Sequence, residues 1–163
     1  ELAAPTDSVS ICLSKGLGAP VGSVLCGSFD FIRAARRARK ILGGGMRQAG
    51  VLAAAGIVAL TTMVERLGDD HENAKVLARA LAAVPGVMLD NNAAATNMVY
   101  FYLDEDVPLD TSDLSIALQA QGVLLDASDS RRCRVVTHYG VSKEMVERAV
   151  AVLVDVLKGA LGR

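Results

Sequence analysis

The chain has 163 residues, 52% of them hydrophobic and 21% charged, which suits one domain or a small domain with an appendage. Seventeen basic and eighteen acidic side chains give a net charge of -1, so no global field favours nucleic acid or an anionic membrane. The composition therefore favours chemistry on a small molecule, and no nucleic-acid partner is expected.

The cysteines and the longest apolar run indicate whether to expect a metal site, a membrane span or an oxidising compartment. Cys12, Cys26 and Cys133 are odd in number and lack C-x-x-C spacing, which argues against a disulfide framework and against a zinc site. The longest apolar run, residues 49–60, is shorter than the roughly 18 to 20 residues that span a bilayer. We therefore expect no metal, no membrane span and a reducing, cytoplasmic compartment.

Two short apolar runs, residues 9–13 and 21–26, flank a glycine-rich loop near the start of the chain. Such runs are typical of strands, so the segment predicts a strand, a loop and a second strand. Residues 1–7 lack the basic start and apolar segment of a signal peptide. Because the first element leads directly into the loop, we expect a fragment or a truncated product.

Helical periodicity follows, with apolar residues at i, i+3, i+4 and i+7 spacing. Three glycines at 43–45 end the first helix, and Pro85 stops the last. The pattern predicts helices over residues 29–42, over 46–67, and from a cap at Asp69 or Asp70 to Val84.

Beyond Gly86 the apolar period switches between two and about 3.6 residues, which indicates mixed strands and helices. Strands are expected at 87–89, 98–103, 123–125 and 134–138, and helices at 113–121 and after a cap at Ser142. The predicted fold class is α/β. It comprises the end of a large domain in residues 1–45, bridging helices in 46–84, and a small α+β domain in 85–163.

Lys15 is the first candidate for chemistry. It directly follows an apolar strand and precedes a loop containing Gly16, Gly18 and Pro20, so its side chain would leave a buried strand end for an open loop. An amine desolvated there would be a usable nucleophile. On spacing alone, an exposed loop lysine without a role is the better interpretation.

Three stretches, however, resemble a known family. They are VSICLSKGLGAPVGS at 9–23, RKILGGGMRQAG at 39–50 and RVVTH at 134–138. The first resembles the cofactor-lysine segment of the low-specificity threonine aldolases and is long enough to be specific. The other two are similar to the family at the expected distances, so the resemblance covers almost the whole chain.

The resemblance implies a pyridoxal 5′-phosphate (PLP) enzyme with the aspartate-aminotransferase-like fold, known as fold type I. Lys15 would hold the cofactor covalently, and residues 1–45 would be the end of the large PLP-binding domain. The implied reaction cleaves L-threonine or L-allo-threonine to glycine and acetaldehyde. The implied partners are this amino-acid substrate and further copies of the enzyme in a homo-oligomer.

The resemblance also assigns Arg134 to the substrate carboxylate, a task that suits a planar guanidinium donating two parallel hydrogen bonds. Arg131 and Arg132 are alternatives, although only Arg134 has the R-x-V-T-H context. Arg47, expected at a helix start, would bind the cofactor phosphate in its own site or in a neighbouring subunit's site. His138 receives no catalytic role.

A basic helix face runs through residues 33–40 and ends at Lys40, which resembles a family lysine near the active site. No aromatic residue interleaves its cations, so a solvated or subunit-facing surface is favoured over nucleic-acid binding. The family's ring-stacking histidine, ring-nitrogen aspartate and phosphate loop have no counterpart in the sequence. The chain alone is therefore not expected to cleave threonine, and a non-catalytic remnant or subunit-binding fragment is the alternative.

Overall fold

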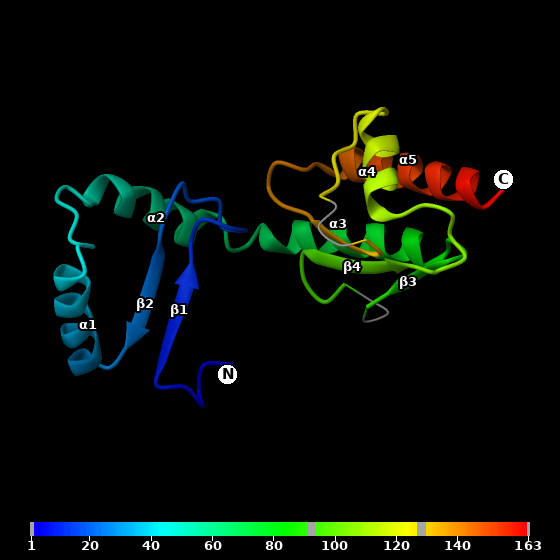
Figure 1. Cartoon of the computed structure of the whole chain (residues 1–163). Helices are drawn as coiled ribbons and strands as arrows, with labels where there is room; N and C mark the ends of the chain where they lie inside the picture. Colours follow the sequence, from blue (N-terminus) through cyan, green and yellow to red (C-terminus); the bar gives the residue numbers. More distant parts are fainter. Residues whose placement is uncertain (1, 91–93, 127–129, 163) are drawn as a thin grey trace. The chain divides into compact units, whose positions relative to one another are not determined.

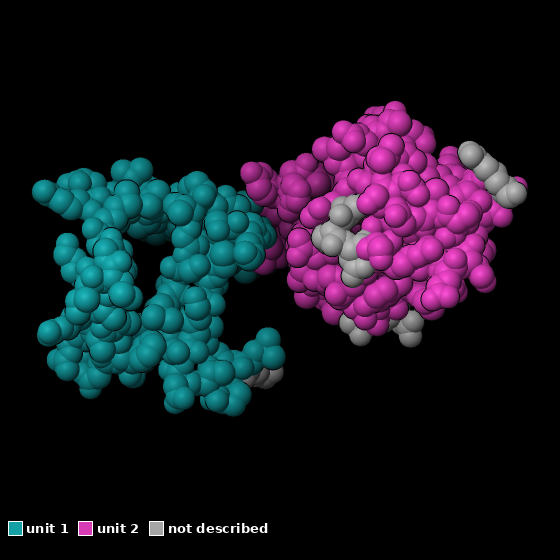
Figure 2. Space-filling model, viewed as in Figure 1, with its two compact units in different colours: residues 1–65 teal, residues 66–163 magenta. Residues whose placement is uncertain are grey.

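The computed structural model describes residues 2–90, 94–126 and 130–162. Over these residues the chain is a mixed α/β fold with five helices and two sheets (Figure 1), which confirms the predicted fold class at that level. It divides into two compact units, residues 1–65 (unit 1) and 66–163 (unit 2), coloured separately in Figure 2. The division falls inside the expected bridging segment 46–84, and the three-part division stays a prediction.

Unit 1 contains an antiparallel hairpin and two helices. Its elements are β1 (Ser8–Cys12), β2 (Ser23–Gly27), α1 (Phe29–Ile41) and α2 (Gly50–Thr62). The register pairs Ser8 with Gly27 and Cys12 with Ser23. The Ser28 hydroxyl accepts a hydrogen bond from Phe31 N (3.3 Å), so a side-chain cap starts α1 immediately after the hairpin.

The core of unit 1 is small. Among its described residues, the buried apolar side chains are Leu13, Ala19 and Ala59, with Leu17 packed against them. Helix α2 has apolar residues on all sides, yet Val51 and Ile57 are exposed. A helix without a polar face is typical of a fully buried position, so α2 has more apolar surface than unit 1 covers.

Unit 2 is a three-stranded antiparallel sheet covered on one face by helices. Its elements are α3 (Leu67–Ala82), β3 (Val87–Leu89), β4 (Met98–Leu103), α4 (Thr111–Gln119), β5 (Arg132–Val136) and α5 (Lys143–Leu161). The strand order is β3-β4-β5. Helix α3 packs against β3, β4 and α5, and α4 packs against α5.

The strands of unit 2 alternate between a covered and an open face, as half-buried strands do. Val99, Phe101 and Leu103 of β4 are buried, as is Cys133 of β5. The open face, which we call the outer face of the sheet, carries Met88, Met98, Tyr100, Tyr102, Arg132, Arg134 and Val136. The strands predicted at 87–89 and 98–103 are confirmed, whereas the strand predicted at 134–138 is found two residues earlier, at Arg132–Val136.

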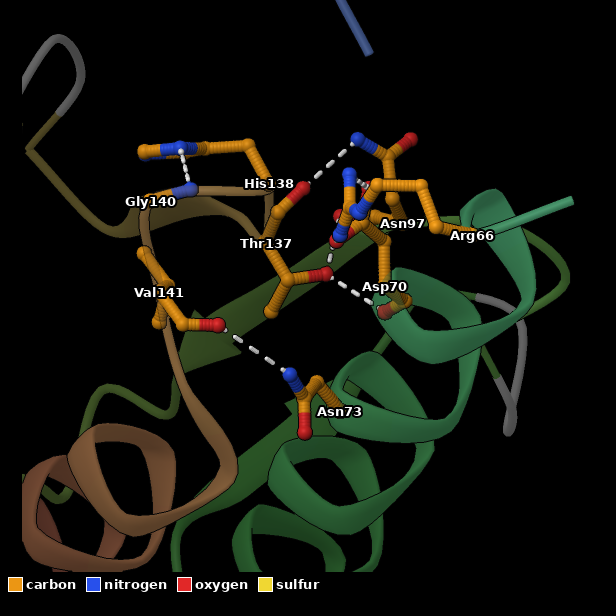
Figure 3. A network of polar contacts seen from close by, with 8 residues as sticks. All are labelled: Arg66, Asp70, Asn73, Asn97, Thr137, His138, Gly140 and Val141. Atoms are coloured by element: carbon orange, nitrogen blue, oxygen red, sulfur yellow. Dashed lines mark hydrogen bonds and ion pairs between the residues drawn. The ribbon is translucent and has the colours of Figure 1, made fainter. Parts of the chain in front are cut away.

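A buried polar network ties α3 to the far end of β5 (Figure 3). The Arg66 guanidinium donates two hydrogen bonds to the carboxylate of Asp70, which is fully buried. The Thr137 hydroxyl donates to the Asp70 carbonyl (2.6 Å), while Thr137 and Asn97 exchange further hydrogen bonds across the strand ends. The last turn of chain after β5 is therefore fixed to the first turn of α3.

This network corrects the expected cap of α3. Arg66, not Asp69 or Asp70, occupies the N-cap position, and no side chain caps the helix there. Asp70 points into the unit instead, because its carboxylate finds a charged partner one helical turn earlier, at Arg66. The cap expected at Ser142 is confirmed, since its hydroxyl accepts from Met145 N (3.3 Å).

Two further predictions are wrong. Residues 123–125 form no strand: Val123 N donates to the Leu118 carbonyl (3.0 Å) and the Leu125 carbonyl accepts from the Ser115 hydroxyl (2.7 Å). Both backbone groups are thus bonded to α4 and not to a neighbouring strand. The helix expected over 46–67 is shorter, because a turn precedes Gly50 and the chain leaves the helix after Thr62.

Candidate functional site

Lys15 lies in the loop between β1 and β2, and hydrogen bonds of the backbone fix this loop. Leu13 N donates to the Gly22 carbonyl (3.0 Å), Ala19 N to the Leu13 carbonyl (3.0 Å) and Gly18 N to the Lys15 carbonyl (2.8 Å). The Lys15 side chain is exposed, and among the described residues no hydrogen bond or ion pair engages its amine. This exposure agrees with the interpretation that spacing alone favoured, and it arises because unit 1 buries few side chains.

The loop that carries Lys15 contains two glycines with positive φ. Gly18 and Gly22 have φ values of 71° and 105°, a region that L side chains rarely adopt. A Cβ built on Gly22 would meet nothing within 4 Å. A free primary amine on an open, backbone-fixed loop is a suitable group for an aldehyde-bearing cofactor such as PLP, so the residues present fit this group.

The cavity next to this loop does not include Lys15. A groove of about 340 Å³ lies between the hairpin and α2, and its lining includes Leu13, Val24 and Ile57. No charged side chain lines it. The groove therefore suits apolar packing and not the phosphate of a cofactor.

Arg47 lies in the turn between α1 and α2, three residues before α2 begins, and its side chain is exposed. The sequence placed it at the start of a helix, whereas the chain first turns through Gln48. Gln48 has φ of 53° and is the only non-glycine residue with positive φ in the described ranges. The helix N-terminus is consequently displaced from Arg47, and its charge alone supports anion binding there.

The glycines before Arg47 let basic side chains pack on the backbone. A Cβ on Gly44 would lie 2.8 Å from Cγ of Arg39, and one on Gly45 would lie 2.6 Å from Cδ of Lys40. Only glycine permits both contacts without rearrangement. The loop thus holds the aliphatic stems of two basic side chains against its backbone, close in sequence to Arg47.

Arg134 lies on β5, an edge strand of the sheet, and its side chain is exposed on the outer face. Its cross-strand partner is Tyr100. No hydrogen bond or ion pair engages the Arg134 guanidinium within the described part of the chain. It is therefore available to an external anion.

Arg131, in contrast, is engaged in structure. Its Nη1 donates to the backbone carbonyls of Asp104 (3.2 Å), Val107 (2.9 Å) and Leu109 (2.9 Å). These bonds fix the segment between β4 and α4 against the start of β5. Arg131 is thus a poor candidate for a substrate ligand.

Arg132 is also engaged. Its Nη2 donates to Asp90 Oδ2 (3.0 Å), and its guanidinium carbon lies 4.7 Å and 5.6 Å from the ring centroids of Tyr100 and Tyr102. The hydrogen bond to Asp90 raises the pKa of Arg132 above its ordinary value. The geometry therefore favours Arg134 over both sequence alternatives as a carboxylate ligand.

Cys12 is a polar feature that the sequence left without a role. Its Sγ lies 3.5 Å from the Ser14 hydroxyl, at the strand end that leads to Lys15. Hydrogen bonding to Ser14 lowers the pKa of the Cys12 thiol, with a smaller contribution from the Lys15 charge. The order Cys-x-Ser-Lys at residues 12–15 could have indicated this, because a hydroxyl and an ammonium both follow the cysteine closely.

The remaining candidates define no metal or histidine site. His138 is exposed, and its Nδ1 accepts from Gly140 N (3.2 Å) within the turn after β5 (Figure 3). No group of three His, Cys, Asp or Glu side chains that could hold a metal ion is found in residues 2–90, 94–126 and 130–162. In the same ranges, no single helix has both the length and the apolar composition to cross a membrane.

Residues 1–104, which include all of unit 1 and the first two strands of the second sheet, match the β-eliminating lyase family. This match covers more than half of the sequence, and the chain belongs to that family. Lys15 and Arg47 lie within the matched region, whereas Arg134 lies beyond it.

Two sequence relatives place the chain more specifically, because both are named as threonine aldolases. The chain is 44% identical over 142 residues to low-specificity L-threonine aldolase 1 of Arabidopsis thaliana, covering 87% of this chain and 40% of the relative. It is 43% identical over 151 residues to the low specificity L-threonine aldolase of Escherichia coli K12, covering 93% of this chain and 43% of the relative. The chain thus spans about two fifths of the length of these relatives.

A solved structure shares the fold. The protein from Listeria monocytogenes assigned as an L-allo-threonine aldolase superposes with a TM-score of 0.79, over 98% of this chain and 46% of that one. The sequence identity is 19%, so this similarity concerns the fold. Both sequence relatives match the family resemblance that the three sequence stretches indicated, and the structural neighbour supports the fold.

Proposed function

We propose that this chain is part of a PLP-dependent aldolase that cleaves L-threonine and L-allo-threonine to glycine and acetaldehyde. The observation that carries the proposal is the exposed, unengaged amine of Lys15 on a loop fixed by backbone hydrogen bonds. Membership of the β-eliminating lyase family implies PLP as the cofactor that such an amine would hold.

The two basic regions have complementary roles in this proposal. Lys15 would hold the cofactor covalently, and Arg47 with the neighbouring glycine loop would bind its phosphate, in the same or a neighbouring subunit. When bound, PLP supplies an electron sink for breaking a bond at Cα. The protein's contribution is to fix the cofactor and to orient the amino acid.

Arg134 would orient the substrate by binding its carboxylate through two parallel hydrogen bonds. A carboxylate held in this way leaves rotation about Cα restricted, so that the Cα–Cβ bond can be aligned for cleavage. The reaction removes the proton of the β-hydroxyl, breaks the Cα–Cβ bond, releases acetaldehyde and returns a proton to Cα to give glycine.

The proposal extends to the organisation of the whole protein. Residues 1–45 would be the end of a large cofactor-binding domain, residues 46–84 would bridge, and residues 85–163 would form a small α+β domain. The exposed apolar side chains of α2 support burial of this helix in a larger assembly, such as a homo-oligomer. The family's cofactor site would then be completed by residues outside this chain.

Replacement of the lysine tests the proposal. In the protein that contains this chain, supplied with PLP and L-threonine, Lys15→Ala should abolish acetaldehyde release and the visible absorbance of protein-bound cofactor. Lys75→Ala is a matched control, since Lys75 is exposed in unit 2 and pairs with Glu72. Turnover that persists in Lys15→Ala would refute the assignment, and an inactive wild-type protein would favour a non-catalytic remnant.

Arg134→Lys tests the substrate ligand separately. An ammonium cannot reproduce the two-pronged contact, so the loss at a partly desolvated site should be on the order of 2 to 4 kcal/mol in threonine binding, with little change in PLP binding. The measurements are the Michaelis constant for threonine and the affinity for PLP. An unchanged Michaelis constant, or loss of PLP instead, would transfer the role to Arg131 or Arg132.

A further inference from the structure

The outer face of the sheet carries two arginines of unequal availability. Arg132 and Arg134 are two residues apart on β5, so they project to the same side and lie about 6 to 7 Å apart along the strand. Tyr100 lies opposite Arg134, and Tyr102 lies opposite Arg132. Without another contact, the face would offer two guanidinium groups to one ligand.

Asp90 makes one of these two guanidinium groups, that of Arg132, unavailable to a ligand. Its backbone N donates to the Tyr100 carbonyl (3.0 Å), which continues the β3–β4 pairing by one residue and places Asp90 in the same row as Tyr100 and Arg134. Arg132 reaches diagonally over the Tyr100 ring to the Asp90 carboxylate, at 3.0 Å. The side chains of Arg132 and Asp90 remain 41% and 35% exposed, so this pair lies at the surface that a ligand would approach.

The charges on this face then sum to a single positive charge. Arg132 and Asp90 neutralise each other, and Arg134 retains its charge without a partner in the described part of the chain. The ring of Tyr100 further occupies the face of the Arg132 guanidinium. One anionic group is matched here, whereas a second would meet an occupied arginine and the Asp90 carboxylate.

We propose that Asp90 determines substrate class at this site: by engaging Arg132 it restricts the face to β-hydroxy amino acids with one carboxylate and excludes those with two. The inference rests on the proposed function, in which Arg134 binds the α-carboxylate. Asp90 acts both by withholding Arg132 and by repelling a second carboxylate, and discrimination through such a repulsive element is a general route to specificity.

The excluded substrate can be named by its chemistry. L-threo-3-hydroxyaspartate has a β-carboxylate where threonine has a methyl group. The same Cα–Cβ cleavage would convert it to glycine and glyoxylate, with loss of the hydroxyl proton and return of a proton to Cα. Cleavage of either substrate needs no additional reactant. The relevant difference between the two substrates is therefore the second carboxylate.

The test compares the two substrates in the protein that contains this chain, with PLP bound. In Asp90→Asn, the ratio of kcat/KM for 3-hydroxyaspartate to that for threonine should rise at least about fivefold, as expected for removing a like charge and freeing a partly exposed arginine. The ratio of inhibition by L-aspartate to inhibition by L-alanine should rise in parallel, which reports binding without cleavage.

Matched variants separate the electrostatic effect from a loss of structure. Asp90→Glu keeps the charge and should keep the wild-type ratio, and Asp106→Asn removes an equal charge from an exposed loop and should also leave the ratio unchanged. In the double variant Asp90→Asn, Arg132→Gln most of the gain should disappear, because the freed guanidinium is gone and only the relief of repulsion remains. Circular dichroism establishes that each variant is folded.

The outcomes are distinct. If the wild-type protein cleaves threonine but Asp90→Asn leaves both ratios unchanged, the inference is overturned and the proposed function stands. A gain that is undiminished in the double variant, or that appears equally in Asp106→Asn, also overturns it, because the effect would then not depend on release of Arg132. If the wild-type protein cleaves no threonine, the proposed function itself fails.

Discussion

The two units bury their apolar residues to very different extents. In the described residues of unit 2, seventeen buried apolar side chains form one cluster, and the buried polar residues Asp70 and Thr137 are hydrogen-bonded to each other beside it. In the described residues of unit 1, three apolar side chains are buried, whereas Val51, Ile57 and other large residues are exposed. Unit 2 therefore contains the interactions that stabilise its own fold, whereas unit 1 has surface that favours association.

The difference also separates two ways of holding a functional group. Arg134 projects from a strand of a packed sheet, so its position depends on the core of unit 2. Lys15 projects from a loop fixed mainly by backbone hydrogen bonds. Changes to packing should therefore affect the two sites unequally, and tyrosine signals can separate them, because the chain has no tryptophan and its three tyrosines, at 100, 102 and 139, all lie in unit 2.

The largest effect is expected for Phe101→Ala. Phe101 is fully buried at the centre of the sheet, so truncation removes its packing and leaves a cavity, at a cost of about 3 to 5 kcal/mol in the free energy of unfolding. Chemical denaturation followed by tyrosine circular dichroism measures this in unit 2. Met88→Ala, on the outer face of the same sheet, is the control and should cost far less. Equal losses in both variants would contradict the one-sided core.

A smaller loss is expected when the polar network is broken. Thr137→Val keeps the shape of the side chain but removes the hydroxyl that donates to the Asp70 carbonyl, and loss of this one buried hydrogen bond should cost about 0.5 to 1.5 kcal/mol. Thr137→Ser retains the hydroxyl and should recover most of the loss. If Ser is no more stable than Val, the methyl contact and not the hydrogen bond stabilises this strand end.

Ile57→Ala should have little effect on unit 1 when the chain is monomeric. Ile57 is 63% exposed on α2, so its truncation is expected to change stability by less than about 0.5 kcal/mol. Leu13→Ala is the contrasting variant, because Leu13 is buried against Ala59. Hydrogen exchange at the β1–β2 amides measures both. A loss in Ile57→Ala equal to that in Leu13→Ala would show that the outer side of α2 is covered.

The smallest structural change, Ser14→Ala, should alter a titration and not the fold. Hydrogen bonding to Ser14 lowers the pKa of the Cys12 thiol, so the thiolate should form at a lower pH than for an ordinary thiol. The pH at half-maximal alkylation of Cys12, followed by mass spectrometry, should rise in Ser14→Ala. Lys15→Ala should raise it less, because the lysine charge contributes less than the hydroxyl. An unchanged midpoint in Ser14→Ala would exclude the hydrogen bond as the cause.

Much of the fold could be predicted because its signals are local. The strands at 87–89 and 98–103 and the cap at Ser142 follow from side-chain period and a single hydroxyl, and these predictions are confirmed. The supposed strand at 123–125 is wrong because apolar composition cannot show that the Leu125 carbonyl bonds to Ser115. Burial of Asp70 could not be predicted either, since its carbonyl meets Thr137, 67 residues away.

The candidate site was predictable in part. The residue types and the resemblance indicated Lys15 and Arg134, and the structure adds that Arg131 and Arg132 are engaged while the Arg134 guanidinium lacks a partner in the described ranges. Periodicity alone could not separate three arginines within four residues, because their partners lie on other elements. The exposure of Lys15 agrees with the interpretation that spacing alone favoured, and it follows from how little unit 1 packs around the loop.

The run of arginines around Cys133 also constrains how this chain can vary. Cys133 is fully buried, while Arg132 and Arg134 on either side face outward. Because successive side chains of a strand point to opposite faces, one inserted or deleted residue here would turn a guanidinium into the core and expose the cysteine. Amino-acid replacements on the outer face preserve this alternation and should destabilise the sheet much less. Homologues should therefore differ in composition along β5 more readily than in the number of residues between Arg131 and Thr137.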